Sequence, residues 1–319
     1  MLCFDKILSE QQNTAVALGF FDGLHIGHRS VISSAAKERK NGLLPVCFTF
    51  AQSPKSVITD SQICSVMTYA DKINTLSSLG IEHTYFADFR QVMNLSAKSF
   101  VEEILIKKLN AKKLFCGFNY RFGKNAEGNT EVLQNLCNEF GVKLTVLPPT
   151  SYDGQVVSST LIKQLITEGN VKKANTLLCG QFGFCCEIKH GKQLGRELGI
   201  PTINQPAAEN LILPKFGVYA SVVTLQSGEQ FCGVTNVGIK PTVGGTIPLW
   251  ETWMPKYHGG EIYGQQADIR LIDFIRPEKK FDSLDDLKAE IIKNSKTALE
   301  IFKAEHIETR SNSNGKTTV

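Results

Sequence analysis

In the first half of the chain, short apolar runs alternate with segments of helical spacing, and this alternation limits the possible folds most strongly. Strands that alternate with helices of ordinary length form a parallel sheet with helices on both faces. We therefore expect an α/β first domain. Its predicted strands are Thr14–Leu18, Leu44–Phe50, Ile81–Phe86, Lys113–Cys116 and Val142–Leu147, all read as buried, and its predicted helices are His28–Lys40, Ala70–Leu79, Ser96–Leu109 and Thr130–Phe140.

The second half has a different pattern. A predicted helical pair comes first, Ser159–Thr167 and Val171–Leu178, and Gly180 suits the position after a helix end. Short β-rich runs separated by Gly- and Pro-containing loops follow, a pattern typical of a small barrel or sandwich. The predicted strands are Phe184–Lys189, Val218–Leu225, Gln230–Val237 and Gln266–Phe274.

A predicted helix closes the second half, opened by the capping box of Ser283 and Asp286 and continuing in its apolar spacing to Phe302. These patterns predict two domains, residues 1–180 and 181–308, and a polar, disordered tail over residues 309–319.

Composition excludes several classes of protein. Hydrophobic residues make up 42% of the 319 residues and charged residues 21%, which suits buried cores rather than general disorder. The net charge of +4 is too small for a dedicated nucleic-acid binder, and no apolar run is long enough to span a bilayer. The 9 cysteines show no CxxC pair, which favours reduced thiols over disulfides or a structural zinc. We expect a cytoplasmic protein, monomeric or weakly self-associating, with no nucleic-acid or membrane partner.

The segment Gly19–His28 (GFFDGLHIGH) leads from a predicted strand into a helix. His25 and His28 are one helical turn apart, so both imidazoles lie on one side. Gly27 lets a phosphate approach the backbone, and the amides of a helix N-terminus favour an anion. Imidazole N–H groups there can stabilise a phosphate that gains charge during a displacement. A pair of ordinary surface histidines is the plain alternative, and zinc is disfavoured because no third ligand lies nearby.

Two later segments fit the same pocket. Cys116–Gly123 (CGFNYRFG) follows a predicted strand and combines aromatic rings, a cation and turn glycines, which suits a flat ring and a phosphate. Val157–Lys163 (VSSTLIK) lies at a helix start, where hydroxyls cap free amides or meet a triphosphate. Alone, the first segment is equally consistent with a plain loop, and for the second simple helix capping is the better interpretation.

A second candidate site lies in the β-rich half. The run from His190 to Asn204 (HGKQLGRELGIPTIN) contains three glycines with Lys192 and Arg196, a cationic loop suited to phosphates. Thr202 and Asn204 are two apart, so in an extended chain both point the same way and can share Mg²⁺. The pattern is not a Walker A sequence, and a basic surface turn is the alternative.

Together these blocks resemble the bacterial bifunctional riboflavin kinase/FMN adenylyltransferases. The first half resembles their Rossmann-like nucleotidyltransferase module through Gly19–His28, Gly117–Gly123 and Ser158–Lys163. The second resembles the barrel of riboflavin kinases through Gly199–Asn204 (GIPTIN), and further matching blocks are Pro214–Ala220, Gly233–Thr242 and Ile275–Leu287. The resemblance extends from about residue 14 to 303.

The resemblance implies two reactions: ATP-dependent phosphorylation of riboflavin to FMN in the C-terminal domain, and adenylylation of FMN to FAD in the N-terminal one. It implies Mg²⁺ as the metal, held by Thr202 and Asn204, and Glu251 as the carboxylate that takes the proton of the riboflavin 5′-hydroxyl. His25 and His28 are the implied catalytic residues of adenylyl transfer. In the first domain, the resemblance implies flavin contacts by Asn119, Arg121 and Phe122, and ATP contacts by Gly19, Phe20, Asp22, Gly27, Ser158, Ser159, Thr160 and Lys163. In the second domain, it implies flavin contacts by Arg276 and Glu278, and ATP contacts by Gly191, Lys192, Gly195 and Arg196.

The chain departs from the family pattern in a few positions. Ser53 stands where the family commonly has a histidine, Asn119 replaces an aspartate, and Lys163 replaces an arginine. These changes fall mainly on the adenylyl-transfer half. Two alternatives therefore remain at this point: a riboflavin kinase with a weakened or lost adenylyltransferase site, and another nucleotidylyltransferase with the HxGH element, which would leave Gly199–Asn204 and Glu251 unexplained. A third reading is a non-catalytic flavin sensor.

Overall fold

The computed structural model describes residues 2–3, 12–189, 199–242 and 245–314. The contacts divide the chain into two compact units, 1–159 and 160–319. This division falls before the helical pair, whereas the boundary predicted from sequence follows it at residue 180. The predicted pair is present with the predicted bounds, as α7 (Ser159–Thr167) and α8 (Val171–Leu178), and all but the first residue of α7 belongs to the second unit.

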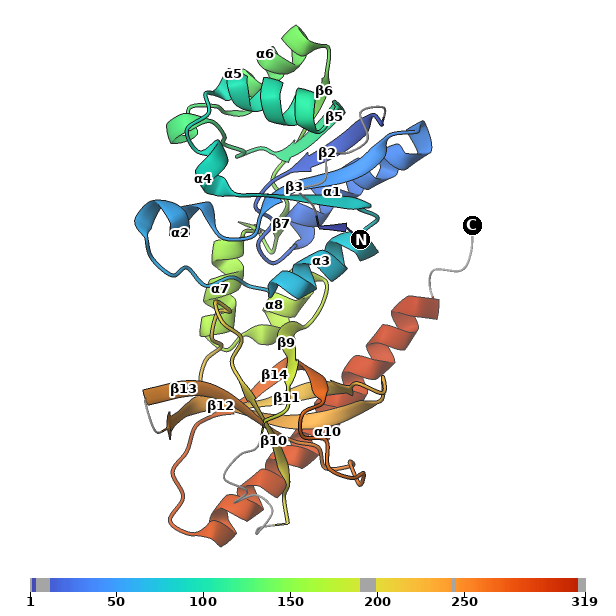
Figure 1. Ribbon diagram of the computed structural model, residues 1–319. Coiled ribbons are helices and arrows are strands. Elements are labelled where there is room, and N and C mark those ends of the chain that lie inside the picture. Colours follow the sequence, from blue (N-terminus) through green and yellow to red (C-terminus); the bar gives the residue numbers. More distant parts are fainter. Residues whose placement is uncertain (1, 4–11, 190–198, 243–244, 315–319) are drawn as a thin grey trace. The chain divides into compact units, whose positions relative to one another are not determined.

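The first unit is built on a six-stranded parallel sheet in the order β1-β4-β3-β2-β5-β6 (Figure 1). Strand β2 lies between β3 and β5. The chain therefore adds β3 and β4 on one side of β2, and then adds β5 and β6 on its other side. The strands are β1 (Leu2–Cys3), β2 (Thr14–Leu18), β3 (Leu44–Phe50), β4 (His83–Ala87), β5 (Ala111–Gly117) and β6 (Lys143–Leu147), with the hairpin of β7 (Ser151–Tyr152) and β8 (Gln155–Val156).

Helices cover both faces of this sheet, because side chains along each strand alternate between the faces. From β2, Val16 and Leu18 join the core under η2 and α6, while Ala15 and Ala17 join the core under α1 and α3. The helical elements are α1 (Ile26–Lys37), η1 (Glu38–Asn41), α2 (Pro54–Thr59), α3 (Tyr69–Ser78), α4 (Phe89–Val92), α5 (Ala97–Ser99), η2 (Phe100–Lys108), η3 (Lys124–Ala126) and α6 (Thr130–Phe140).

The helix expected over 96–109 is present, as α5 followed by the wider π-helix η2. Two other details of these predictions were wrong. The strand β6 is not buried: it lies at the edge of the sheet, with Lys143, Thr145 and Val146 exposed. After α8, Cys179 rather than Gly180 takes the left-handed conformation, at φ 51°.

The second unit contains a six-stranded antiparallel sheet in the order β10-β13-β12-β11-β14-β9. Lys189, just beyond one edge strand, pairs with Asn204 of the other, and the Lys189 amide donates to the Asn204 carbonyl at 2.8 Å. The sheet thus curls into the predicted barrel. The strands are β9 (Phe182–Glu187), β10 (Thr202–Pro206), β11 (Gly217–Leu225), β12 (Gln230–Thr242), β13 (Gly245–Trp253) and β14 (Gln266–Pro277).

The barrel has a packed interior and one face covered by the terminal helix α10 (Leu284–Asn314). Trp250 fills the interior with the rings of Phe182 and Phe184. On the outer face, Ala298 of α10 packs against apolar side chains of β11, β12 and β14. The capping box is confirmed, since Ser283 Oγ accepts from the Asp286 amide. Residues 309–314 of the expected disordered tail are instead helical, and 315–319 lie outside the described residues.

Candidate functional site

The first candidate site lies where β2 and β5, neighbours in the sheet, end. Leu18 pairs with Cys116, so the segments after both strands leave the same edge of the sheet. From β2 the chain continues to β3, and from β5 it continues to β6, so the two connections lead away from each other along the sheet. Open α/β sheets bind ligands in the crevice at such a switch point. The structure therefore brings Gly19–His28 and Gly117–Gly123 to one edge, as the sequence motifs predicted.

The turn after β2 is unusually tight. Phe21 and Leu24 are non-glycine residues in the left-handed region, at φ 54° and 44°. A Cβ on Gly19 would lie 2.8 Å from the Phe21 ring, so the turn requires glycine there. Backbone strain of this kind persists only when surrounding contacts impose it, and it concentrates at functional sites.

Several hydrogen bonds impose that shape. The Val66 amide donates to Asp22 Oδ1 at 2.7 Å, and Ser159 Oγ donates to the Asp22 carbonyl at 2.8 Å. Arg29 Nε donates to the Leu24 carbonyl at 3.0 Å. Two expected ATP contacts, Asp22 and Ser159, thus act together in the structure by fixing the turn.

The two histidines lie at the tip of α1. His25 caps the helix, because its Nδ1 accepts from the His28 amide at 3.3 Å, and this is why α1 begins at Ile26 rather than His28. The two rings stack with centroids 3.6 Å apart. A Cβ on Gly27 would lie 3.3 Å from the His25 ring, a tight contact that glycine avoids while leaving the backbone beside the ring open.

Burial keeps both imidazoles neutral. It lowers the pKa of His25 to about 4, against a smaller opposing effect from Asp22. Burial also holds the pKa of His28 well below its usual value, and electrostatic coupling to His25 and to the Lys72 ammonium acts in the same direction. With Nδ1 of His25 accepting a hydrogen bond, its proton is on Nε2, which makes that atom a donor. The pair can therefore stabilise developing phosphate charge but is not a pair of cations.

The loop after β5 differs from the expectation in one residue. Asn119 and Arg121 are exposed, as a flavin contact requires, but Phe122 is 7% exposed and belongs to the core. A bridge between Phe122 and Gly128 turns the ring inward, where it packs against Phe100 with centroids 5.6 Å apart. The aromatic ring that the loop does expose is Phe118, at 46%.

The remaining residues expected to contact ATP are divided between the two units. Phe20 lies in the turn itself, and Ser158 follows the hairpin of β7 and β8 in the first unit. Thr160 and Lys163 lie in α7, within the second unit. Lys72, which donates to the Phe20 carbonyl, was missed by the sequence analysis.

The second candidate site lies on the outer face of the barrel. Asn204 of β10 and Asn236 of β12 lie directly opposite Glu251 of β13, one on each side of it. Thr202 shares the face of Asn204, as its two-residue spacing predicted. The register thus brings together the expected metal ligands and the expected carboxylate, and adds Asn236, which no sequence motif singled out.

Asn204 has the character of a ligand for a hard cation. The residue is 5% exposed, and its Oδ1 is buried with no hydrogen-bond partner among the described residues. Buried amide oxygens rarely stay unpaired without a reason. Amide and hydroxyl oxygens are ligands that Mg²⁺ takes, so Asn204 and Thr202 fit that ion. No cluster of His, Cys, Asp or Glu suited to a metal occurs within the described parts of the chain.

Glu278 also reaches this face. Its carboxylate lies against Gly238, at the place a Cβ would occupy, and Asn236 Nδ2 lies 3.6 Å from the same point. A Cβ at this position would displace the Glu278 carboxylate, so glycine leaves room for the carboxylate there. Asn236 is therefore beside both expected acidic residues, Glu251 across the ladder and Glu278 over Gly238.

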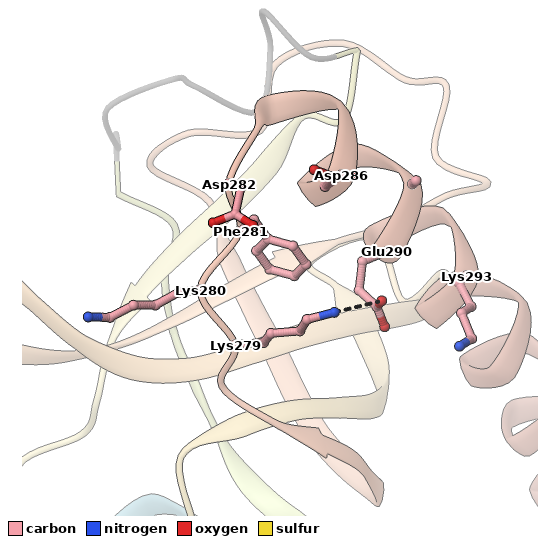
Figure 2. A pocket seen from close by; sticks show the side chains of 8 residues that line it. Lys279, Lys280, Phe281, Asp282, Asp286, Glu290 and Lys293 are labelled. Carbon is pink, nitrogen blue, oxygen red and sulfur yellow. Dashed lines mark ion pairs between the residues drawn. The ribbon is translucent and has the colours of Figure 1, made fainter.

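Next to Glu278 in sequence, Arg276 pairs with Glu290 of α10, with Nε and Oε1 3.5 Å apart. Its guanidinium lies 5.6 Å from the centre of the Phe281 ring. Beside it is an open cavity of about 420 Å³, in which Lys279 forms a second ion pair with Glu290 (Figure 2). The cavity is lined by Lys279, Lys280, Phe281, Asp282, Asp286, Ala289, Glu290 and Lys293.

The expected kinase loop residues Gly191, Lys192, Gly195 and Arg196 lie outside the described residues. In the described parts of the chain, no helix is both long enough and apolar enough to cross a membrane. The cysteines from Cys47 to Cys232 are free thiols, and Cys185 and Cys186 are strand residues of β9.

Comparison with known proteins finds a family match for each half of the chain. A family model described as FAD synthetase matches residues 7–161, and one described as riboflavin kinase matches residues 178–302. A bifunctional riboflavin kinase/FMN adenylyltransferase of Escherichia coli K12 is 32% identical over 92% of this chain and 94% of its own. The Bacillus subtilis protein of the same name is 32% identical over 93% of this chain and 95% of its own.

A solved structure from Streptococcus pneumoniae, described as a macrolide-efflux protein, has a TM-score of 0.82 and 31% identity, covering 90% of this chain and 94% of that one. The full-length match to relatives with both domains excludes an unrelated nucleotidylyltransferase. The chain belongs to the family of bifunctional riboflavin kinase/FMN adenylyltransferases.

Proposed function

We propose that this chain makes FAD in two steps, each in its own unit. The barrel unit transfers the γ-phosphoryl group of ATP to riboflavin, giving FMN and ADP. The α/β unit transfers the adenylyl group of a second ATP to FMN, giving FAD and pyrophosphate. The observation that carries the proposal is the presence of two separate sites suited to phosphate chemistry, one at the histidine-capped tip of α1 and one around Glu251.

In the kinase step, the riboflavin 5′-oxygen attacks the γ-phosphorus while ADP leaves. The Glu251 carboxylate takes the hydroxyl proton as the new O–P bond forms. Asn204 and Asn236, its cross-strand neighbours, orient that carboxylate. Bound Mg²⁺, held by the Thr202 hydroxyl and the buried Asn204 Oδ1, would neutralise phosphate charge.

For the flavin of this step, we propose the region of Arg276 and Glu278 beside the cavity at α10. The Phe281 ring, already in contact with the Arg276 guanidinium, offers an aromatic surface for the flat flavin ring. Glu278 over Gly238 joins this region to the Glu251 face.

The adenylyl step requires no proton acceptor, because the attacking FMN phosphate is already ionised. A phosphate oxygen of FMN attacks the α-phosphorus of ATP, and pyrophosphate leaves. The neutral imidazoles of His25 and His28 donate hydrogen bonds to the phosphates as charge builds. The exposed Asn119 and Arg121, with Phe118 in place of the buried Phe122, are the proposed flavin contacts. Since both steps consume ATP and the described thiols are free, we infer a cytoplasmic enzyme.

The test is product analysis by chromatography after incubation with MgATP. The protein should convert riboflavin to FMN and, given FMN, produce FAD. In Glu251→Gln, FMN formation should fall by about 10²–10⁴-fold, while FAD formation from FMN continues. Glu209→Gln, at an exposed position, is the matched control. The proposal fails if FAD never forms from FMN, or if Glu251→Gln phosphorylates riboflavin normally.

A further inference from the structure

Lys72 of α3 is a buried lysine that none of the sequence motifs includes. The residue is only 6% exposed. A buried ammonium is costly unless hydrogen bonds compensate for the water it loses. The two hydrogen bonds that Lys72 makes both go to main-chain carbonyls, those of Phe20 and Phe50, at 2.5 and 3.2 Å.

These two carbonyls lie at the ends of neighbouring strands, and Lys72 joins them. Phe50 is the last residue of β3, and Phe20 lies in the turn directly after β2. The ammonium also lies 4.6 Å from the centre of the Phe20 ring. The same Phe20 carbonyl accepts a second hydrogen bond from Thr49 Oγ1 at 2.9 Å. Lys72 thus ties the turn to β3 from the side of α3.

The residue after Phe20 shows why such a tie is needed. Phe21 is held in the left-handed region, and its ring meets His28 edge-on with centroids 5.4 Å apart. Any relaxation of Phe20 and Phe21 toward ordinary backbone angles would move that ring and the imidazole against which it packs. The position of His28 therefore depends on a strained turn that Lys72 holds.

Lys72 also acts on the histidines through its charge. The groups around it are Asp22 of the turn, Cys47 of β3 and His28 of α1, and His28 in turn faces His25. Burial lowers the pKa of Lys72 to about 8, with Cys47 and Asp22 opposing, so the ammonium is charged at neutral pH. Its charge helps to keep His28 unprotonated.

We propose that Lys72 is a positioning residue of the adenylyl-transfer site: by holding the Phe20 carbonyl, it fixes the Gly19–His28 turn in the shape that presents the His25–His28 pair to the phosphates of ATP. This inference rests on the proposed function of the first unit. It assigns no contact between Lys72 and substrate, since its hydrogen bonds are to the main chain.

The experiment compares Lys72→Met, which keeps the aliphatic stem, with Lys72→Arg, which keeps the charge, in the full chain. Lys37→Met, at the exposed far end of α1, is the matched control. Adenylylation of FMN and phosphorylation of riboflavin are measured separately on each protein. Lys72→Met should lose at least about tenfold in kcat/KM for adenylylation, Lys72→Arg should recover part of it, and kinase rates should stay within about twofold.

A second readout needs no catalysis. NMR titration of the imidazole signals without substrate should give a higher pKa for His28 in Lys72→Met than in the wild type, and no change in Lys37→Met. If the protein makes no FAD, the proposed function fails, but the shift in the His28 pKa should still be seen. If that shift is absent, the role of Lys72 fails, so the two proposals are tested separately.

The proposal is overturned if folded Lys72→Met adenylylates FMN within twofold of wild type, or if it only lowers the thermal midpoint while its imidazole titrations are unchanged. If Lys72→Met does not fold, the wild-type pH profile decides. Adenylylation should then decline as the pH rises above about 8, where Lys72 loses its charge, while kinase activity does not. Parallel profiles would overturn the proposal.

Discussion

The His28 backbone amide donates to the imidazole Nδ1 of His25, so the residue that caps α1 is also one of the pair that we propose to contact phosphate. The cap uses one ring nitrogen and leaves the other as a donor. The two histidines therefore cannot be treated as independent side chains, because the ring orientation of one depends on the backbone of the other.

Acid should destabilise the first unit through His25. Its pKa is about 4 in the folded chain and 6.5 ordinarily, so between these values the unfolded chain binds a proton that the folded chain does not. The stability that the neutral ring contributes is complete above pH 6.5 and declines as the pH falls toward 4. Urea unfolding at a series of pH values should show the midpoint falling through this window.

Asn is a good N-cap residue but does not titrate, which makes His25→Asn the informative variant. It should unfold with a shallower pH dependence than wild type and should lose FMN adenylylation at pH 7. An unaltered pH dependence in the variant would contradict the assignment of this effect to His25.

Replacing Gly238 with Ala should impair the kinase site. The added Cβ collides with the Glu278 carboxylate and lies 3.6 Å from Asn236 Nδ2. Displacement of Glu278 should raise the KM for riboflavin by about tenfold, equivalent to about 1.4 kcal/mol. Steady-state kinetics of FMN formation checks this. Gly260→Ala, where nothing lies within 4 Å of the new Cβ, is the control and should behave as wild type.

Asn204→Ala should weaken the use of Mg²⁺ in the kinase reaction. Asn204 Oδ1 has no hydrogen-bond partner among the described residues, so the loss of this oxygen leaves no protein donor unpaired. The Mg²⁺ concentration for half-maximal riboflavin phosphorylation should rise about 10- to 100-fold. The adenylyl-transfer reaction of the same protein serves as the internal control, and an unchanged Mg²⁺ requirement of the kinase would count against Asn204 as a ligand.

Thr235→Val should destabilise the barrel. Inside it, the Thr235 hydroxyl lies 2.7 Å from Ser221 Oγ and 2.8 Å from Thr252 Oγ1, and all three residues are fully buried. Valine removes both hydrogen bonds and leaves two buried hydroxyls short of a partner, at a cost of about 1–3 kcal/mol. Denaturant unfolding measures this loss in the free energy of unfolding. Thr224→Val, at a partly exposed position, is the control.

Local patterns predicted most of the α/β unit, because its strands and helices follow hydrophobic periodicity. The strands over 14–18 and 44–50 have the predicted bounds. The barrel was harder. Strand β13 was missed because Pro248 and Gly245 disfavour a strand locally, while pairing with β10 and β12 on both sides stabilises it.

The candidate sites divide in the same way. The histidine pair and the Thr202–Asn204 spacing are local and were visible in the sequence. Lys72 lies 52 positions from Phe20, and Asn236 reaches Glu251 only through strand register, so neither contact leaves a local signal. The burial of Phe122 could not be predicted, because an aromatic residue in a glycine-rich loop gives the same sequence pattern whether its ring stacks on a ligand or enters the core.

The bridge between Lys189 and Asn204 has a consequence beyond the shape of the barrel. An open sheet would have two edge strands whose unpaired backbone N–H and C=O groups could pair with neighbouring molecules, and such edges promote aggregation. Asn204 pairs with Lys189 through its backbone, whereas its side chain is the proposed ligand of Mg²⁺. Substitutions of Asn204 should therefore change metal binding while the closed edge still protects against self-association.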